Sequence, residues 1–303
     1  MINKLIASAL PYIPEKLIWI FSKKYIAGKS IFDAIQVSKK LNDEGNLITL
    51  DLLGEHINNL DEAESYKNNY AEIIKQTESA LIKGNYSLKP TMFGLLINRE
   101  VCYENIKEII KIAASYNNFI RIDMEGSECT QKEIDLFIKL KKEFPDNVGL
   151  VFQVYLKRTY NDILNLMNLK NQNTDLNFRI CKGIYIEPES IAYKKEDEIN
   201  RNFEFILDYL FKNDIYVAIA THNKEIINSA IKMIELYNVP SNRYEFQMLY
   251  GVSPELRRKL VKKGYKMRVY VPFGDKWFNY STRRLKENPS LVYHIIKSLF
   301  IKN

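Results

Sequence analysis

The most constraining feature of this sequence is a regular alternation of short β-branched segments with stretches of helical periodicity. Eight segments have the apolar, β-branched character of strands and end at polar or turn-forming residues. They cover Leu47–Leu52, Ser87–Thr91, Phe119–Met124, Val148–Tyr155, Asn177–Gly183, Tyr216–Thr221, Tyr244–Leu249 and Met267–Val271. Strand and helix repeated eight times predict a parallel sheet that closes into a (βα)8 barrel.

Helix-start signals lie between these segments. The run Thr130–Glu133 has the sequence of a capping box, which predicts a helix that begins there, just after the third strand. After the seventh strand, Ser253 is a candidate N-cap and Pro254 suits the first helical turn. The pattern predicts a single-domain protein, with a helical N-terminal extension over residues 1–46 and the barrel over residues 47–303.

Composition limits the class of protein. The 303 residues carry a net charge of +7, and the lysines are spread over many predicted helices. This distribution predicts a solvated basic surface, which would suit an anionic cofactor or membrane surface, and does not indicate a nucleic-acid-binding module. Cys102, Cys129 and Cys181 lack metal-ligand spacing, and the chain has neither a signal-peptide pattern nor an uncharged apolar run of membrane-spanning length. These features favour a cytoplasmic protein.

Nearly every predicted strand ends in polar or charged side chains. In chain order these are Asp51 and Glu55, Lys89, Asp123 and Glu125, Gln153 and Tyr155, Arg179 and Lys182, Thr221 and His222, Gln247 and Tyr250, and Tyr270. Burying so many polar groups costs free energy unless they are paired or hold a ligand. The set contains no nucleophile elbow, phosphate-binding loop or metal-ligand cluster, so a bound organic cofactor is expected to carry the chemistry.

At these strand ends the sequence resembles the monofunctional bacterial-type proline dehydrogenases. The matching stretches are Asp51–Glu55, Arg121–Glu125, Gln153–Thr159, Arg179–Tyr185, Ala220–His222, Phe246–Gly251 and Arg268–Gly274, followed by Trp277 and Tyr280–Leu285. They are collinear with the family, and the ordered set is far more specific than any one stretch. Departures are small: Ile184 replaces a usual alanine, Asn223 a common aspartate and Phe273 a frequent tyrosine.

The resemblance implies a fold and an activity. The family is a distorted (βα)8 barrel that binds FAD and places its last helix above the barrel. It oxidises L-proline to Δ1-pyrroline-5-carboxylate by hydride transfer to flavin N5 and passes the electrons to a membrane quinone. Such an acceptor suits a cytoplasmic enzyme with peripheral association at the inner face of the cytoplasmic membrane. Because the chain ends at Asn303, a separate pyrroline-5-carboxylate dehydrogenase is expected to perform the next step.

The resemblance also assigns a substrate site. Arg283 and Arg284 match the pair that binds the substrate carboxylate, and Lys89 matches the lysine that faces the same group. Residues matching the walls of the proline ring are Tyr185, Leu249 and Tyr270. A tyrosine at position 270 implies a preference for proline over hydroxyproline. Glu55 matches an acid that pairs with Arg284 when the site closes.

The cofactor site follows in the same way. Arg179 resembles the arginine near flavin N5, Gln153 the amide that contacts the isoalloxazine ring, and Asp123 the acid beneath Lys89. The other cofactor contacts implied by the resemblance are Lys182, Gly183, Thr221 and His222. Arg179, Asp123 and Tyr270 are thus the expected catalytic residues, and no metal is expected.

Alternative interpretations exist for the same residues. On spacing alone, Arg283 and Glu287 could form an exposed helix pair worth only about 0.3–0.5 kcal/mol. Lys89 could be a lysine at the barrel rim. Rival activities are another FAD barrel of the methylenetetrahydrofolate-reductase type and a hydroxyproline-specific or silent relative. A basic membrane- or nucleic-acid-binding protein without chemistry is the rival of another class. The collinear stretches favour the proline dehydrogenase.

Overall fold

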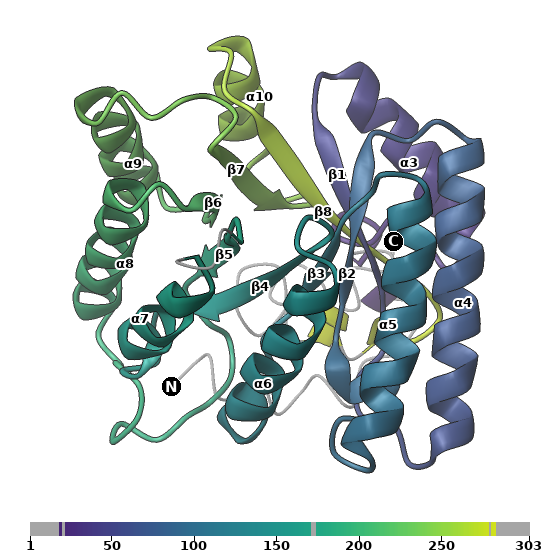
Figure 1. The fold of residues 1–303 in the computed structure, drawn as a ribbon. Coiled ribbons are helices and arrows are strands. Elements are labelled where there is room, and N and C mark those ends of the chain that lie inside the picture. Colours follow the sequence, from purple (N-terminus) through teal and green to yellow (C-terminus); the bar gives the residue numbers. More distant parts are fainter. Residues whose placement is uncertain (1–17, 20–21, 171–173, 279, 283–303) are drawn as a thin grey trace, which may run out of the picture.

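Eight parallel strands form a closed barrel in the order of the sequence (Figure 1). The computed structural model describes residues 18–19, 22–170, 174–278 and 280–282. The strands are β1 Leu47–Leu52, β2 Gly84–Leu88, β3 Ile120–Ile122, β4 Val148–Gln153, β5 Asn177–Cys181, β6 Tyr216–Ala220, β7 Tyr244–Leu249 and β8 Met267–Phe273. β8 closes the barrel on β1, with Leu47 opposite Arg268 and Leu52 opposite Phe273. The predicted (βα)8 barrel is therefore confirmed.

Helices follow the strands and surround the barrel (Figure 1). They are α3 Ile31–Asp43, α4 Leu60–Ser79, α5 Arg99–Ser115, α6 Ser127–Glu143, α7 Thr159–Lys170, α8 Glu196–Lys212, α9 Lys224–Leu236 and α10 Pro254–Lys262, with a short 3-10 helix, η2, at Pro90–Phe93. α3 precedes the first strand and packs against β1 and β8. Its start is a capping box in which Ser30 and Asp33 bond each other's backbone N–H groups.

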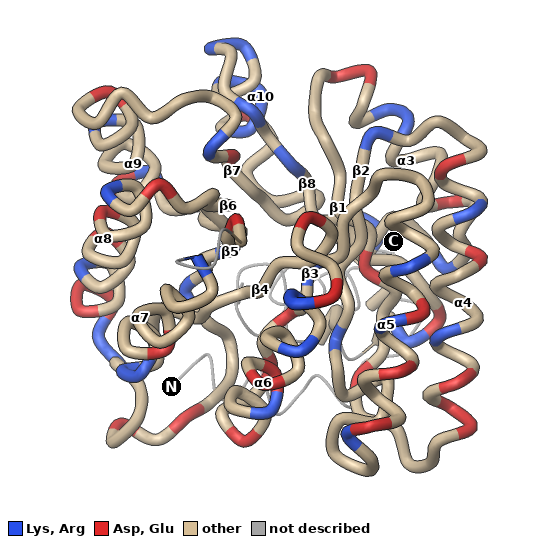
Figure 2. Tube along the Cα trace, in the orientation of Figure 1, with Lys and Arg blue, Asp and Glu red and all other residues tan. Residues whose placement is uncertain are grey.

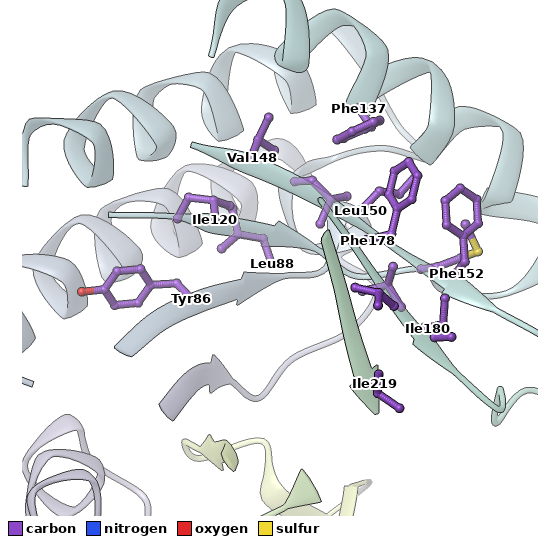
Figure 3. Close-up of a cluster of buried hydrophobic side chains, with 14 of the residues drawn as sticks. Tyr86, Leu88, Ile120, Phe137, Val148, Leu150, Phe152, Phe178, Ile180 and Ile219 are labelled. Atoms are coloured by element: carbon purple, nitrogen blue, oxygen red, sulfur yellow. The ribbon is translucent and has the colours of Figure 1, made fainter. Parts of the chain in front are cut away.

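The strand residues alternate between two environments, as the pleat of a β-strand dictates. One set is apolar and packs toward the helices, as Leu88, Ile120 and Leu150 do in Figure 3. In the same layer, the Phe178 ring lies 5.0 Å from Phe152 and 6.2 Å from Phe137 of α6, both edge-on. The other set points into the barrel, where polar side chains from strands that are not neighbours meet. The core is thus the layer between barrel and helices.

The segment before α3 lies against the end of β8. The Ala27 N–H donates to the Pro272 carbonyl, and the Gly274 N–H donates to the Gly28 carbonyl. The rings of Trp19 and Trp277 lie 4.7 Å apart, and the Lys29 ammonium stands 5.3 and 5.7 Å from their centres. Aromatic contact and cation–π attraction therefore join the two ends of the described chain.

Some local expectations were wrong. The second strand runs over Gly84–Leu88 and not Ser87–Thr91, because Pro90, which has no N–H to donate to the ladder, begins η2. The Thr130 capping box is also wrong: α6 begins at Ser127, and Thr130 is buried inside it. The N-cap at Ser253 is confirmed, although its side chain makes no capping hydrogen bond.

Charged residues of both signs are distributed over the outer helices, as Figure 2 shows. This agrees with the expected solvated surface. The side of the molecule seen in Figure 2 is neither uniformly positive nor uniformly negative. Among the described residues, none of the helices has both the length and the apolar character needed to cross a bilayer.

We expect Phe178→Ala to lower the free energy of unfolding by about 3–5 kcal/mol, because it removes a fully buried ring between barrel and helices. Urea unfolding followed by far-UV circular dichroism measures the change. Phe32→Ala is the control, since Phe32 is 66% exposed and should cost less than about 0.5 kcal/mol. Equal losses for the two variants would contradict this account of the core.

Candidate active site

A cavity of about 770 Å³ opens at the carboxyl ends of the strands. This volume lies within the range of small-molecule and cofactor sites, roughly 300–1,000 Å³. Every described residue that the family resemblance assigned to the site lines it: Glu55, Lys89, Asp123, Gln153, Arg179, Lys182, Gly183, Tyr185, Thr221, His222, Leu249 and Tyr270. Of the other polar strand ends, Tyr155 and Tyr250 do not line it. Arg283, Arg284 and the helix expected above the barrel lie outside the described residues. The structure thus brings together side chains from most of the strands.

Asp123 is the centre of the hydrogen bonding in this cavity. Its Oδ1 accepts from Arg179 Nη1 at 2.8 Å and from Ser87 Oγ at 3.0 Å, and its Oδ2 accepts from the Tyr270 hydroxyl at 2.8 Å. Burial raises the pKa of Tyr270 well above its usual value, and the charges of Asp123 and Asp51 raise it further. Tyr270 therefore stays protonated and donates its hydroxyl proton to Asp123.

These contacts fix Arg179, and other N–H groups of its guanidinium are still available to donate. Its Nη1 also donates to Ser87 Oγ at 3.1 Å, and its guanidinium stands 5.3 Å from the centre of the Tyr270 ring. Nε and Nη2 of Arg179 are buried and have no hydrogen-bond partner among the described residues. Because unpaired buried donors are costly, a cationic group held this way in a cavity wall is suited to an electron-rich ligand.

Lys89 pairs with Asp51, a contact that the sequence reasoning did not assign. The Lys89 ammonium lies 2.5 Å from Asp51 Oδ1, whereas the expected neighbour, Asp123, is engaged by Arg179. Burial alone would lower the pKa of Lys89, but the carboxylates of Asp51 and Asp123 outweigh it and raise that pKa. Lys89 is therefore a cation at the cavity wall.

Below the cavity, the barrel interior is filled by hydrogen-bonded polar groups in place of the branched apolar layers usual in such barrels. Arg268 donates from Nε to Glu245 at 2.7 Å and from Nη1 to the Ile48 carbonyl at 2.8 Å. Burial raises the pKa of Glu245, but Arg268, Gln247 and Arg121 together outweigh burial and hold it at about 2. Arg121 donates to the Asn177 side chain at 2.6 Å, and burial lowers its pKa to about 9.

The loop after β5 forms one wall of the cavity. Gly183 has φ +106°, and a Cβ there would stand 2.2 Å from the Tyr155 ring, so both conformation and space require glycine. Gln153 donates to the Glu125 carbonyl at 2.7 Å and accepts from the Ile184 N–H at 3.4 Å. The amide of Gln153 is therefore held between the strand ends and this loop.

His222 joins the ends of two neighbouring strands. Its Nε2 accepts the backbone N–H of Leu249 at 2.9 Å. A ring nitrogen that accepts a hydrogen bond carries no proton, so the neutral ring carries its proton on Nδ1. His222 is therefore oriented by β7 while it lines the cavity.

The sequence reasoning missed the residues that support the cavity from within the strands. Ser87 stands two positions before Lys89, and therefore shares its face of the strand, although β2 ends between them at Leu88. Asp51 was recognised as a polar strand end but received no role. A period of two, counted back from each strand end, is the signal that would have included Ser87, Arg121 and Glu245.

Comparison with known proteins places the chain. The family described as proline dehydrogenase matches residues 34–294. The chain belongs to the proline dehydrogenase family. Proline dehydrogenase 1 of Bacillus subtilis (strain 168) is 31% identical over 93% of this chain and 91% of its own length, and proline dehydrogenase of Deinococcus radiodurans is 30% identical over 95% and 92%. The chain is thus an enzyme of this family.

Solved structures show the same barrel within larger proteins. Proline utilization A from Bdellovibrio bacteriovorus, inactivated by N-propargylglycine, has a TM-score of 0.83 and 27% identity over 88% of this chain and 32% of its own. The corresponding protein from Corynebacterium freiburgense, at 20% identity, has a TM-score of 0.78 over 97% of this chain and 34% of its own, and is similar in fold. The chain spans about a third of these solved proteins.

We expect Glu245→Gln to lower the free energy of unfolding by about 3–5 kcal/mol at pH 7, because it leaves Arg268 and Arg121 without their carboxylate. The pKa of Glu245 is lower in the folded protein than its usual 4.5. The stabilisation that the ionised Glu245 gives to the folded protein is therefore complete above pH 4.5 and is lost as the pH falls toward 2.

Guanidinium unfolding at several pH values checks both parts of this prediction. The difference in free energy of unfolding between wild type and Glu245→Gln should become smaller as the pH falls below 4.5. Glu100→Gln, which removes an exposed partner of Lys139, is the control and should change stability by less than about 1 kcal/mol. A gap that stays constant with pH would contradict an ionised Glu245.

Proposed function

We propose that this enzyme oxidises L-proline to Δ1-pyrroline-5-carboxylate, with FAD as its bound cofactor and a quinone as the final electron acceptor. Family membership supports proline as the substrate. The observation that carries the rest is the state of Arg179. Asp123 and Ser87 fix it in the cavity wall, while its Nε and Nη2 are buried and have no partner in the part of the chain that the structure describes.

The residues present fit a flavin. A planar ring with electron-rich nitrogen and oxygen atoms would satisfy the spare donors of Arg179, and the Gln153 amide lies on the same cavity. Gly183 lets the loop after β5 pack against the Tyr155 ring, where a Cβ would clash, and so holds this wall of the cavity in place. The remaining cofactor contacts in this proposal are Lys182, Thr221 and His222. When bound, FAD would accept the hydride from the proline carbon next to nitrogen.

Arg179 would then act through its charge. A cation held close to the flavin stabilises negative charge on the reduced ring, and it does so without reorganisation because Asp123 already fixes it. Asp123 also accepts the Tyr270 hydroxyl, so one carboxylate orients both the cofactor contact and the substrate wall. This shared partner is the basis for treating Arg179, Asp123 and Tyr270 as the catalytic group.

The substrate half of the cavity would recognise a small zwitterion. Lys89 supplies a fixed cation for the carboxylate, and the paired guanidiniums of Arg283 and Arg284 are proposed to complete its binding, because planar donors bind a carboxylate bidentately. Tyr185, Leu249 and Tyr270 would enclose the ring. Glu55, which lines the cavity, is proposed to pair with Arg284 as a gate.

The proposal extends to the setting of the enzyme. Residues 47–303 would form the catalytic barrel, with residues 1–46 as an extension of which α3 packs against β1 and β8. The enzyme would work in the cytoplasm, peripheral to the inner face of the membrane where it meets its quinone. A separate pyrroline-5-carboxylate dehydrogenase would consume the product.

The test is anaerobic addition of L-proline to purified protein loaded with FAD. We expect the visible absorbance of the flavin to bleach and to recover when a soluble quinone is added. Bleaching by NADH but not by proline would instead support a reductase of the methylenetetrahydrofolate type. Bleaching by trans-4-hydroxyproline alone would support the hydroxyproline-specific alternative. Protein that binds no flavin would overturn the proposal.

Lys89→Met should raise the KM for proline by roughly 10- to 100-fold, the value of a charge-assisted hydrogen bond of about 1.5–3 kcal/mol. Flavin retention after gel filtration should stay within about twofold, because Lys89 is assigned to the substrate. The variant leaves Asp51 buried without its cation. The double variant Lys89→Met/Asp51→Asn removes that cost and keeps the test valid if the single variant misfolds.

Lys139→Met is the control for this series, since Lys139 forms an exposed ion pair with Glu100 and neither residue lines the cavity. A KM for proline that stays at the wild-type value in both Lys89 variants would contradict the assignment of Lys89.

A further inference from the structure

The loop between β5 and α8 lines the cavity with its first residues, Lys182 to Tyr185. Beyond them it is attached to the rest of the protein at two places. Its later part is bound to the chain after β4, where Leu156 and Ala192 form an isolated bridge and the Tyr193 N–H donates to the Tyr155 carbonyl. The second point of attachment is Glu187, between these two parts.

Glu187 is a buried acid in an exposed stretch. It is 8% exposed, whereas Ile186 before it is fully exposed and residues 188–191 after it are all exposed. A carboxylate loses its hydration on burial, so it remains there only if hydrogen bonds replace the water. Glu187 does not line the cavity.

The partner of Glu187 is the first residue of α6. The Ser127 N–H donates to Glu187 Oε1 at 2.8 Å and the Ser127 hydroxyl donates to Oε2 at 2.6 Å. The N-cap of α6 is Gly126, which has no side chain to accept from the free N–H groups of the first turn. Glu187 provides that acceptor from 60 positions along the chain, and its charge is favoured at a helix N-terminus.

The contact also reaches the rest of the loop. The Lys194 ammonium donates to the Glu187 backbone carbonyl, which joins the end of the loop to its middle. On the cavity side, the Ile184 N–H donates to the Gln153 side chain at 3.4 Å. Tyr185 therefore lies between two fixed points, Ile184 on Gln153 and Glu187 on Ser127.

We propose that Glu187 is a positioning residue for substrate binding: by capping α6, it sets the place of Ile184 and Tyr185 in the cavity wall. The assignment of Tyr185 to the proline ring rests on the proposed function. The contact between Glu187 and Ser127 does not, and the two can be tested separately.

Glu187→Ala should raise the KM for proline about tenfold, equal to about 1.4 kcal/mol, with kcat at saturating proline changed by less than about threefold. Glu187→Gln should restore the KM to within about threefold, because its amide can accept from the Ser127 N–H and donate to the hydroxyl. Ser127→Ala removes one of the two bonds and should have an intermediate effect. It also serves if Glu187→Ala misfolds.

Glu189→Ala is the matched control, since Glu189 is an exposed acid in the same loop. Hydrogen-exchange mass spectrometry, without substrate, should show faster exchange over residues 182–187 in Glu187→Ala and no change in Glu189→Ala. If exchange rises but the KM stays at the wild-type value, Glu187 is structural only and the proposal is overturned. If both stay unchanged, the contact is not made.

Failure of the proposed function gives a different result. In that case wild-type protein itself would not be reduced by proline, while Glu187→Ala would still exchange faster over the loop.

Discussion

The three hydrogen bonds to Asp123 are the interaction on which the cavity depends. Arg179 from β5, Ser87 from β2 and Tyr270 from β8 all donate to this one carboxylate. A carboxylate is suited to this task because it accepts several donors at once and neutralises the guanidinium that it orients. Strands from different parts of the barrel are thus fixed relative to one another at the level where the chemistry is proposed.

The barrel interior can be polar because most of its buried side chains form hydrogen bonds with one another. Below the cavity, Glu245 is hydrogen-bonded to Arg268, Arg121 to Asn177 and Thr49 to Asn85. The apolar packing that stabilises the fold lies outside the barrel, between strands and helices, where Phe152 and Phe178 meet. Because the apolar packing lies outside the barrel, charged and hydrogen-bonding side chains can occupy its interior.

The sequence predicted the elements whose signals are local. β1 and β7 have the expected bounds, since in both strands apolar residues alternate with polar ones up to a clear end. β2 was placed three residues late because the polar start of that strand, Gly84 and Asn85, carries no strand signal and only its position beside β1 makes it one. The site residues were predicted together because their order along the chain resembles a family, and all the described ones line one cavity.

Contacts between residues far apart in the chain could not be predicted from local sequence signals. The N-cap of α6, Gly126, has no side chain that could mark the start of the helix, and the acceptor for the Ser127 N–H comes from Glu187. A search for a nearby cap therefore selected Thr130, which is buried within the helix. Asp51 was visible as a strand end, but its pairing with Lys89 depends on the side-by-side placement of β1 and β2. Such pairs exist only once the barrel is closed.

The meeting of Trp19 with Trp277 has a practical consequence for work in solution. These are the two tryptophans of the whole chain, and their rings lie 4.7 Å apart, where the segment before α3 meets the end of β8. Emission excited at the red edge of the absorption band therefore reports on this seam and on no other part of the molecule. Loosening of the seam can be followed optically, apart from melting of the barrel, without attaching a probe.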